Sequence, residues 1–258
     1  MIGLRRSLPA APALGLFLLA AALSAPGAGA AGEAAGLPPG YWASPLAAQG
    51  EAPADWDQAE RSLAPQDCGE CHQDQYLDWR TSLHAQAFSP GLVGQLVTTF
   101  SGNPGSCLRC HAPLAEQGAA FRAALAKGEG HLANAQGLAA AGNSCAGCHL
   151  RRHRRYGPPQ RESGETGRSD PDGPHGGVTR TADFEKSNFC SACHQFPPSW
   201  GTVNGKAMEN TFNEWKASPQ AAKGITCQAC HMPGRRHLWR GIHHPQTVKA
   251  GLTAKFEA

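Results

Sequence analysis

The chain is poor in the residues that usually fill a protein core. Aromatic residues make up 7% of its 258 residues, and it contains only three methionines and three tyrosines. After the first 30 residues, no apolar stretch is long enough to cross a bilayer, so no stable membrane span is expected in the mature chain. Side chains alone are therefore not expected to form the whole core.

No cysteine lies outside one repeated pattern. A disulfide framework does not require a histidine after every second cysteine, a redox-active dithiol is normally a single motif, and zinc does not demand five Cys-His neighbours. Five copies with no cysteine left over indicate covalent attachment of c-type haem. The motifs are Cys68, Cys71 and His72; Cys107, Cys110 and His111; Cys145, Cys148 and His149; Cys190, Cys193 and His194; and Cys227, Cys230 and His231.

Each motif supplies the groups that one haem c needs. The two thiols form thioethers with the porphyrin, and the adjacent histidine lies under the iron as the proximal ligand. The five motifs begin 37 to 45 residues apart, which predicts five haem c groups in one domain over residues 67–258. Because the porphyrins would form much of the core, the predicted fold class is mainly α with extensive coil and little or no β-sheet.

The N-terminus has the features of an export signal. Two arginines precede an apolar run over residues 8–23, and Ala28-x-Ala30 has the small residues of a cleavage site. We expect residues 1–30 to be a signal peptide and residues 31–66, rich in Ala, Pro and Gly, to be an arm or linker. The alternative is a membrane anchor, for which the run is short. A periplasmic, secreted or cell-surface location follows.

Hydrophobic periodicity and helix breakers predict few helices. They are expected over 73–88, 113–127, 210–218 and 247–256, and the polar stretch 151–177, rich in Pro and Gly, is expected to be a long loop. The stretches DWRTSLH (78–84) and EWKASPQ (214–220) share an acidic-Trp-basic-x-Ser pattern. This internal echo predicts packing roles for its tryptophans and serines, and only its first copy ends in a histidine.

Seven histidines lie outside the motifs, and five low-spin haems would need five of them as second axial ligands. On a continuous helix, His84 would lie about 18 Å from His72, so it is expected to bind the iron of a different haem. His153 lies four residues after His149, on the same side of a helix, and is also expected to reach another haem. The predicted distal ligands are His84, His153, His175, His237 and His243, with His131 and His244 as alternatives.

The stretches CGECHQDQYLDWRTSLHA and FCSACHQF to RGIHHP resemble the multihaem cytochrome c-554/c-prime family over residues 68–248. The resemblance implies that histidines at the five predicted distal positions serve as ligands. It also implies electron transfer in the periplasm or at the outer surface. Related proteins include hydroxylamine-oxidising and nitrite-reducing enzymes, but this chain has no Cys-x-x-Cys-Lys motif and too few haem motifs for the octahaem enzymes.

The expected function is electron transfer between redox partners through mostly bis-histidine, low-spin haems. Expected partners are a quinol-oxidising membrane cytochrome, a terminal reductase or an outer-membrane conduit, as in anaerobic respiration, and a homo-oligomer or filament is a further arrangement. Nucleic acid is not expected, because haem propionates offset the formal net charge of +3. The alternative is an enzyme that converts a small nitrogen species at one five-coordinate haem, with Arg235, Arg236 or Arg240 orienting an anion.

Overall fold

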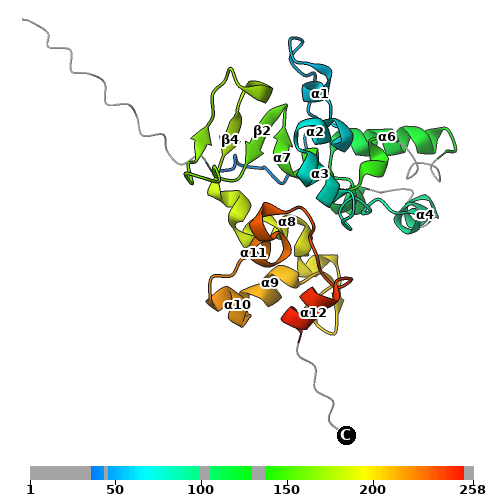
Figure 1. Cartoon of the computed structure of the whole chain (residues 1–258). Helices are drawn as coiled ribbons and strands as arrows, with labels where there is room; N and C mark the ends of the chain where they lie inside the picture. The colour runs from blue at the N-terminus through cyan, green and yellow to red at the C-terminus, as the bar shows by residue number, and fades with distance from the viewer. Residues whose placement is uncertain (1–35, 44–45, 99–104, 130–136, 253–258) are drawn as a thin grey trace, which may run out of the picture. The chain divides into compact units, whose positions relative to one another are not determined.

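The computed structural model describes residues 36–43, 46–98, 105–129 and 137–252. The expected signal peptide and His131 lie outside these ranges. Short helices joined by long connections dominate the described parts (Figure 1), and the strands are two to four residues long. The fold is thus mainly helix and coil, as the sequence predicts.

The helices are α1 (Gln58–Arg61), α2 (Pro65–Cys71), α3 (Gln73–Trp79), α4 (Pro90–Thr98), α5 (Gly105–His111), α6 (Ala115–Ala126), α7 (Cys145–His149), α8 (Ser191–His194), α9 (Thr211–Lys216), α10 (Pro219–Ala222), α11 (Cys227–His231) and α12 (Pro245–Gly251). The strands are β1 (Leu150–Arg151), β2 (Arg154–Gly157), β3 (Gly167–Arg168), β4 (Val178–Arg180), β5 (Thr202–Val203) and β6 (Lys206–Ala207).

Each Cys-x-x-Cys-His motif coincides with a short helix, α2, α5, α7, α8 or α11, that ends at its histidine or one residue before it, although Cys190 is the N-cap of α8 and lies just outside it. A spacing of three residues places both thiols on the same face of a helical turn. In the last of these helices, the hydroxyl of Thr226 accepts a hydrogen bond from the backbone N–H of Ala229 and caps the first turn. Local helix formation therefore presents the two thiols together at each motif.

The predicted helix over 73–88 is shorter in the structure. Helix α3 ends at Trp79, because the hydroxyls of Thr81 and Ser82 donate to the carbonyls of Asp78 and Trp79 at 2.8 and 2.7 Å and favour a series of turns. His84 therefore lies in a turn instead of on the helix. Helices α6 and α9 fall within their predicted ranges, and α12 overlaps the start of the last one.

The prediction of one long loop over 151–177 was wrong in part. Strands β1 to β4 form a small sheet in the order β1-β2-β4-β3, in which β2 and β4 are parallel and the other pairs antiparallel. Arg152 and His153 form the two-residue turn between β1 and β2, with φ values of 51° and 58°. Since α7 ends at His149, His149 and His153 do not share a helix.

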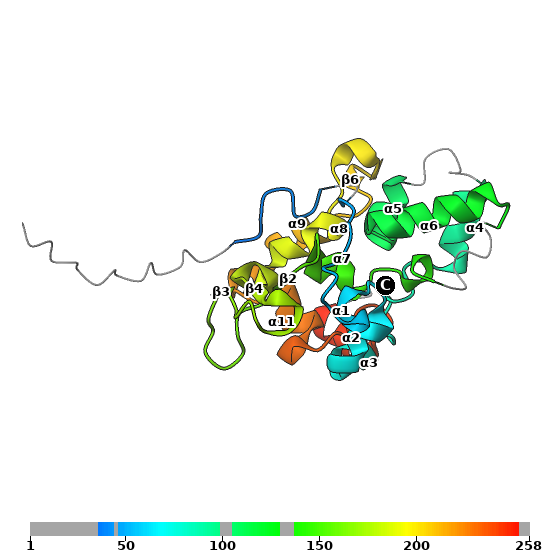
Figure 2. The ribbon, with the colours of Figure 1, turned by 90° about the horizontal axis from the view of Figure 1, so that it is seen from above.

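Apolar side chains gather in separate small clusters. Helices α4, α5 and α6 share one around Phe88, Leu96 and Phe121, and Figure 2 shows these helices together, away from the sheet. The N-terminal segment contributes to the others. The hydroxyl of Tyr41 donates to the Cys148 carbonyl at 2.6 Å, which ties this segment to the third motif.

Gln117 on α6 is fully buried, and its side chain holds three backbone groups. It accepts from the N–H of Leu114 and donates to the carbonyls of Leu138 and Gly142. Replacing Gln117 with Met keeps the length and leaves these groups unpaired. We expect the variant to lose at least about 2 kcal/mol of unfolding free energy, measured by guanidinium denaturation of the holoprotein. Gln73→Met on exposed α3 is the control, and equal losses would contradict the assignment.

Candidate functional site

The helices that carry the motifs are neighbours in pairs. All ten cysteines have free thiols. The thiol of Cys68 lies close to that of Cys145, and α2 contacts α7. The thiols of Cys190 and Cys227 also lie close together, and the backbone N–H of Cys227 donates to the hydroxyl of Ser187, three residues before Cys190, at 3.0 Å. The first motif therefore lies against the third, and the fourth lies against the fifth.

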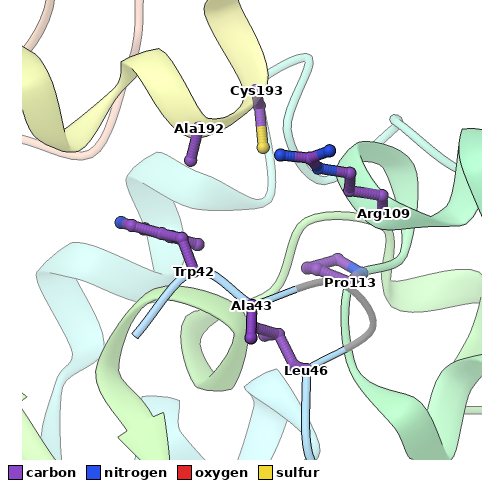
Figure 3. A pocket seen from close by; sticks show the side chains of 7 residues that line it. All are labelled: Trp42, Ala43, Leu46, Arg109, Pro113, Ala192 and Cys193. Carbon is purple, nitrogen blue, oxygen red and sulfur yellow. The ribbon is translucent and has the colours of Figure 1, made fainter. Parts of the chain in front are cut away.

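The second motif also lies against the fourth. The thiols of Cys110 and Cys193 lie close together, and α5 contacts α8. Figure 3 shows the guanidinium of Arg109 pointing toward the thiol of Cys193 in a small pocket between these motifs. The fourth motif thus has two neighbours. The pocket is lined by Trp42, Ala43, Leu46, Arg109, Pro113, Ala192 and Cys193.

The ten cysteines predicted to attach haem differ in burial. Cys71 and Cys230, the second cysteines of the first and fifth motifs, are exposed, whereas the other eight are partly buried. The thiols that meet between motifs belong to the partly buried group, as with Cys68 and Cys227. An exposed thiol is accessible to a reacting group, so the exposure of Cys71 and Cys230 is compatible with thioether formation. Haem attachment at all ten cysteines stays a prediction.

Three of the motif histidines are oriented by a backbone carbonyl. Because a carbonyl oxygen can only accept, the Nδ1 atom of each ring must carry the proton. The Nε2 atom of the neutral ring then has a free lone pair, which is the form that binds a metal ion. The contacts from Nδ1 are His111 with Ala87 at 2.7 Å, His149 with Tyr156 at 2.8 Å and His231 with Arg240 at 2.6 Å.

Rings from outside the motifs face three of the motif histidines. Each pair joins a motif histidine to a predicted distal ligand from a remote part of the chain. The structure therefore places three of the five predicted distal ligands next to motif histidines. His84 lies next to the histidine of the fourth motif and not next to His72 of the first motif, which precedes it in the chain. The pairs are His72 with His175, His84 with His194, and His149 with His237, with ring centroids 6.4, 6.2 and 6.2 Å apart.

A centroid separation of about 6 Å suits one metal ion between two imidazoles. A metal–imidazole bond is about 2 Å and the ring centroid lies roughly 1 Å behind its nitrogen, so two opposed rings span about 6 Å. Two imidazoles do not fill the coordination sphere of iron, and a porphyrin supplies the remaining four nitrogens. Free paired thiols stand beside each motif histidine. The donor set fits haem c.

Burial favours the neutral form of four of the paired rings. Burial, followed by the proximity of His194 and His237, lowers the pKa of His84 to about 4. Burial, followed by the proximity of His237, also lowers the pKa of His149 to about 4. The pKa values of His175 and His237 are lowered as well, again chiefly by burial. A neutral imidazole can donate its lone pair to a metal ion.

Backbone contacts fix the segment around His84. The indole N–H of Trp79 donates to the Asn143 carbonyl at 2.9 Å, and the N–H of Asn143 donates to the His84 carbonyl at 2.9 Å. Gly142 has a φ of 58°, and a Cβ there would lie 2.6 Å from the His84 carbonyl oxygen, so glycine is required. Since Asn143 is two residues before Cys145, these contacts place the third motif beside His84.

The repeated stretches DWRTSLH and EWKASPQ also make the same kinds of hydrogen bond. The indole of Trp215 donates to the carbonyl of Ile225, two residues before Cys227, at 2.9 Å. In both copies the serine hydroxyl donates to the carbonyl of the tryptophan. Trp79 therefore ties its segment to the third motif, and Trp215 ties its segment to the fifth. The first copy follows the first motif and contacts the segment before the third motif, and the second copy follows the fourth motif and contacts the segment before the fifth.

The buried carboxylate of Asp78 fixes the segment that carries His237. Asp78 is 5% exposed, accepts from the guanidinium of Arg236 at 2.5 and 2.6 Å, and accepts from the backbone N–H of His237 at 3.0 Å. The hydrogen bond from Arg236, followed by that from the His237 backbone, holds its pKa below the usual range. Asp78 was not predicted as a site residue. The acidic position shared by the two tryptophan stretches is the signal that could have indicated it.

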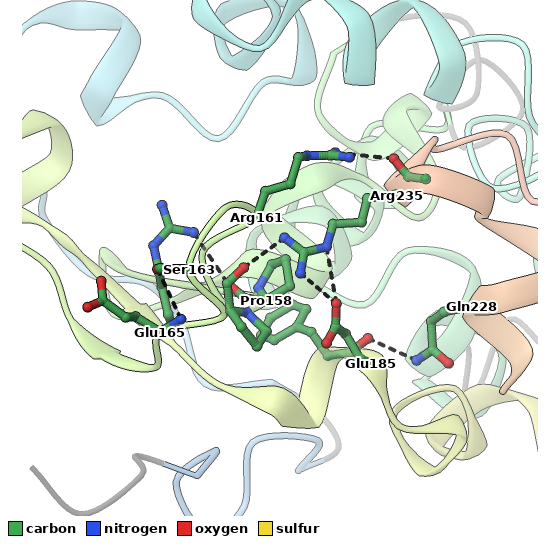
Figure 4. Close-up of polar contacts among 11 residues, drawn as sticks. Pro158, Arg161, Ser163, Glu165, Glu185, Gln228 and Arg235 are labelled. Carbon is green, nitrogen blue, oxygen red and sulfur yellow. Dashed lines mark hydrogen bonds and ion pairs between the residues drawn. The ribbon is translucent and has the colours of Figure 1, made fainter. Parts of the chain in front are cut away.

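Two of the arginines considered for anion binding contact carboxylates of this chain. The guanidinium of Arg235 donates to Glu185 at 2.6 and 3.1 Å and to the carbonyl of Pro159 at 2.7 Å, and Figure 4 shows it turned toward Glu185. Arg236 is paired with Asp78. These contacts anchor the segment after the fifth motif instead of facing an anion site.

His153 has a different environment from the paired rings. It is buried, and its Nε2 atom donates to the Gly50 carbonyl at 3.0 Å. Its Nδ1 atom is the nitrogen left for a metal ion, and it has no hydrogen-bond partner among the described residues. Its ring lies edge-on to Trp56, 6.3 Å between centroids. The structure does not place His153 against a motif histidine in the described ranges.

The histidines near the C-terminus also differ from one another. His243 is exposed. The Nδ1 atom of His244 accepts from the N–H of Thr247 at 3.3 Å and caps α12, so the proton of the neutral ring lies on Nε2. In the part of the chain that the structure describes, no histidine ring pairs with His111 or His231.

Residues 67–149, which contain the first three motifs, match the family model for cytochrome c554 and c-prime. This match supports a multihaem c-type cytochrome. The chain is also similar to a penta-haem cytochrome c552 from Thermochromatium tepidum, at 22% identity and a TM-score of 0.49. That similarity covers 75% of this chain and 60% of the length of the cytochrome c552 chain. Among curated proteins, none matches.

Asp78→Asn tests the anchor of the His237 segment. Asn keeps the shape but loses the charge that pairs with Arg236, so we expect the holoprotein to lose about 1–2 kcal/mol of unfolding free energy. Asp74→Asn, at an exposed position on the same helix, is expected to stay within about 0.5 kcal/mol of the parent. Both values come from denaturant titration followed by far-UV circular dichroism. Equal effects of the two changes would contradict the anchor.

Proposed function

We propose that this chain is a pentahaem c-type cytochrome that transfers electrons between redox partners. The strongest support is that three motif histidines each have a second histidine ring opposite them, with ring centroids 6.2–6.4 Å apart. When bound, each haem iron supplies one-electron redox chemistry. An iron with imidazoles on both sides has no position for a substrate, which suits a carrier.

The proposed ligand sets follow from these pairs. The first haem takes His72 and His175, the third takes His149 and His237, and the fourth takes His194 and His84. For the other two haems, His111 and His231 are the proximal ligands, and His153 and His243 remain the proposed distal ones. The contacts of His111 and His231 with backbone carbonyls support their role as proximal ligands, because the Nε2 atom of each ring stays available to bind iron.

The chain holds the motifs in a branched order. Thiol contacts place the first motif against the third, and the second and fifth against the fourth. His84 and His237, the proposed distal ligands at the fourth and third motifs, both contact the indole of Trp239. The first, second and fifth motifs are then the ends of the array, where partners would exchange electrons.

We further propose that residues 1–30 direct export and that residues 67–258 form the haem domain in the periplasm or at the cell surface. Both ideas rest on the sequence. Within the described residues, helices are too short or too polar to span a membrane. The described residues before Gln66 pack on the region proposed as the haem domain through Tyr41 and Leu46. Cleavage after residue 30 can be checked by N-terminal sequencing of the exported protein.

A second candidate function is conversion of a small nitrogen species at one open iron. It is favoured by His111 and His231, which have no ring partner within the described ranges. An iron with one free axial position could bind nitrite or hydroxylamine. Turnover of either compound with a reduced dye would support this function, and its absence would leave the carrier as the better account.

The visible spectrum with and without carbon monoxide separates the two functions. For the carrier, we expect the dithionite-reduced holoprotein to show low-spin bands that carbon monoxide leaves unchanged, because both axial positions of every iron are occupied. Intact mass should show five haems. A high-spin band that shifts with carbon monoxide would contradict a fully closed array and favour the second function.

His84→Gln tests the ligand set proposed for the fourth haem. Glutamine occupies the matching position, Gln220, in the second tryptophan stretch. We expect all five haems to stay attached and one of them to become high-spin and bind carbon monoxide, because attachment depends on the thiols. His244→Gln, which removes the cap of α12, should leave the spectrum unchanged. If His84→Gln opened no iron, the proposed pairing would be wrong.

A further inference from the structure

One indole stands between two of the histidines proposed as distal ligands. The ring of Trp239 lies 4.5 Å from that of His84 and 5.1 Å from that of His237, measured between centroids. The ring planes meet at 79° and 86°. Edge-to-face contacts of this kind are directional, because the ring edge is positive and the face negative. A single side chain therefore contacts both imidazoles in a defined orientation.

The backbone of Trp239 is held in an unfavourable conformation. Its φ is 41°, which is a genuine outlier for a bulky residue and costs of the order of 1–3 kcal/mol. Such strain persists only where the surroundings enforce it. On one side, Asp78 holds Arg236 and the N–H of His237. On the other, the carbonyl of Arg240 accepts from the ring of His231.

The two histidines in contact with Trp239 belong to different motifs. His84 faces His194 of the fourth motif, and His237 faces His149 of the third. Trp239 therefore lies where the pair of motifs one and three meets the group of motifs two, four and five. Rotation of either imidazole about its bond to a metal ion would change its contact with the indole.

We propose that Trp239 is a positioning residue that sets the orientation of both His84 and His237, and thereby the ligand fields of the third and fourth haems together. This rests on the ligand sets proposed above. The ring of His84 neighbours the ring of His194 and the indole, and the ring of His237 neighbours the ring of His149 and the indole. The Nδ1 atom of His237 also donates to the Arg235 carbonyl at 3.0 Å, so the indole is one of two groups that orient this ring. Removing the indole takes a contact away from both rings without removing a ligand.

The test uses the oxidised holoprotein and electron paramagnetic resonance, because the g values of a low-spin ferric haem depend on the relative angle of its axial imidazole planes. With Trp239→Ala, we expect five attached haems, no carbon monoxide binding, and a shift in the g values of two low-spin signals. Trp239→Phe keeps an aromatic edge and should shift the same two signals less. Trp200→Ala removes an exposed tryptophan that stacks on Arg109 and should shift neither of these two.

The outcomes separate this proposal from the ligand assignment. His84→Gln and His237→Gln identify the two signals, since each should convert a different haem to a high-spin form. If neither does, the ligand sets are wrong. If both do and Trp239→Ala leaves both signals in place, or moves only one, the shared positioning role is overturned. If Trp239→Ala loses haem or fails to fold, Trp239→Phe decides, and unchanged signals overturn the proposal.

Discussion

The opposition of two imidazoles across about 6 Å is the constraint on which the rest of this structure depends. Each of the three observed pairs joins residues that are far apart in the chain, as with His84 and His194. A small apolar core around α4, α5 and α6 does not reach these rings. Pairs bridged by iron would act as cross-links between these segments, much as metal binding and folding are coupled in small metal proteins.

The protein positions these rings with ordinary contacts of its backbone and polar side chains. Asp78 holds the turn that carries His237, and Trp79 and Gly142 hold the turn that carries His84. Burial then keeps the rings neutral and able to bind metal. Because each of these contacts joins segments next to different motifs, a substitution that breaks one contact is expected to disturb more than one motif.

The sequence was informative where chemistry is local. The Cys-x-x-Cys-His motifs and the approximate limits of α6 and α9 follow from spacing and breakers, whereas the short helices that carry the motifs were not predicted. One failure is local, at the end of helix α3, and the others concern contacts between residues far apart in the chain. Helix α3 stops at Trp79 because hydroxyl groups compete for its carbonyls, and β2 pairs with β4 across a long connection. No local pattern shows that Asp78 meets Arg236 or that His84 meets His194, since both contacts depend on the tertiary fold.

The central claim is that each pair of opposed rings holds one iron. The most direct measurement is a crystal structure of the holoprotein with anomalous diffraction at the iron absorption edge, which locates the irons independently of the protein atoms. The account predicts five iron peaks, three of which lie midway between His72 and His175, His149 and His237, and His84 and His194. An iron whose second axial ligand differs from the paired ring, or a pair of rings with no iron between them, would contradict it.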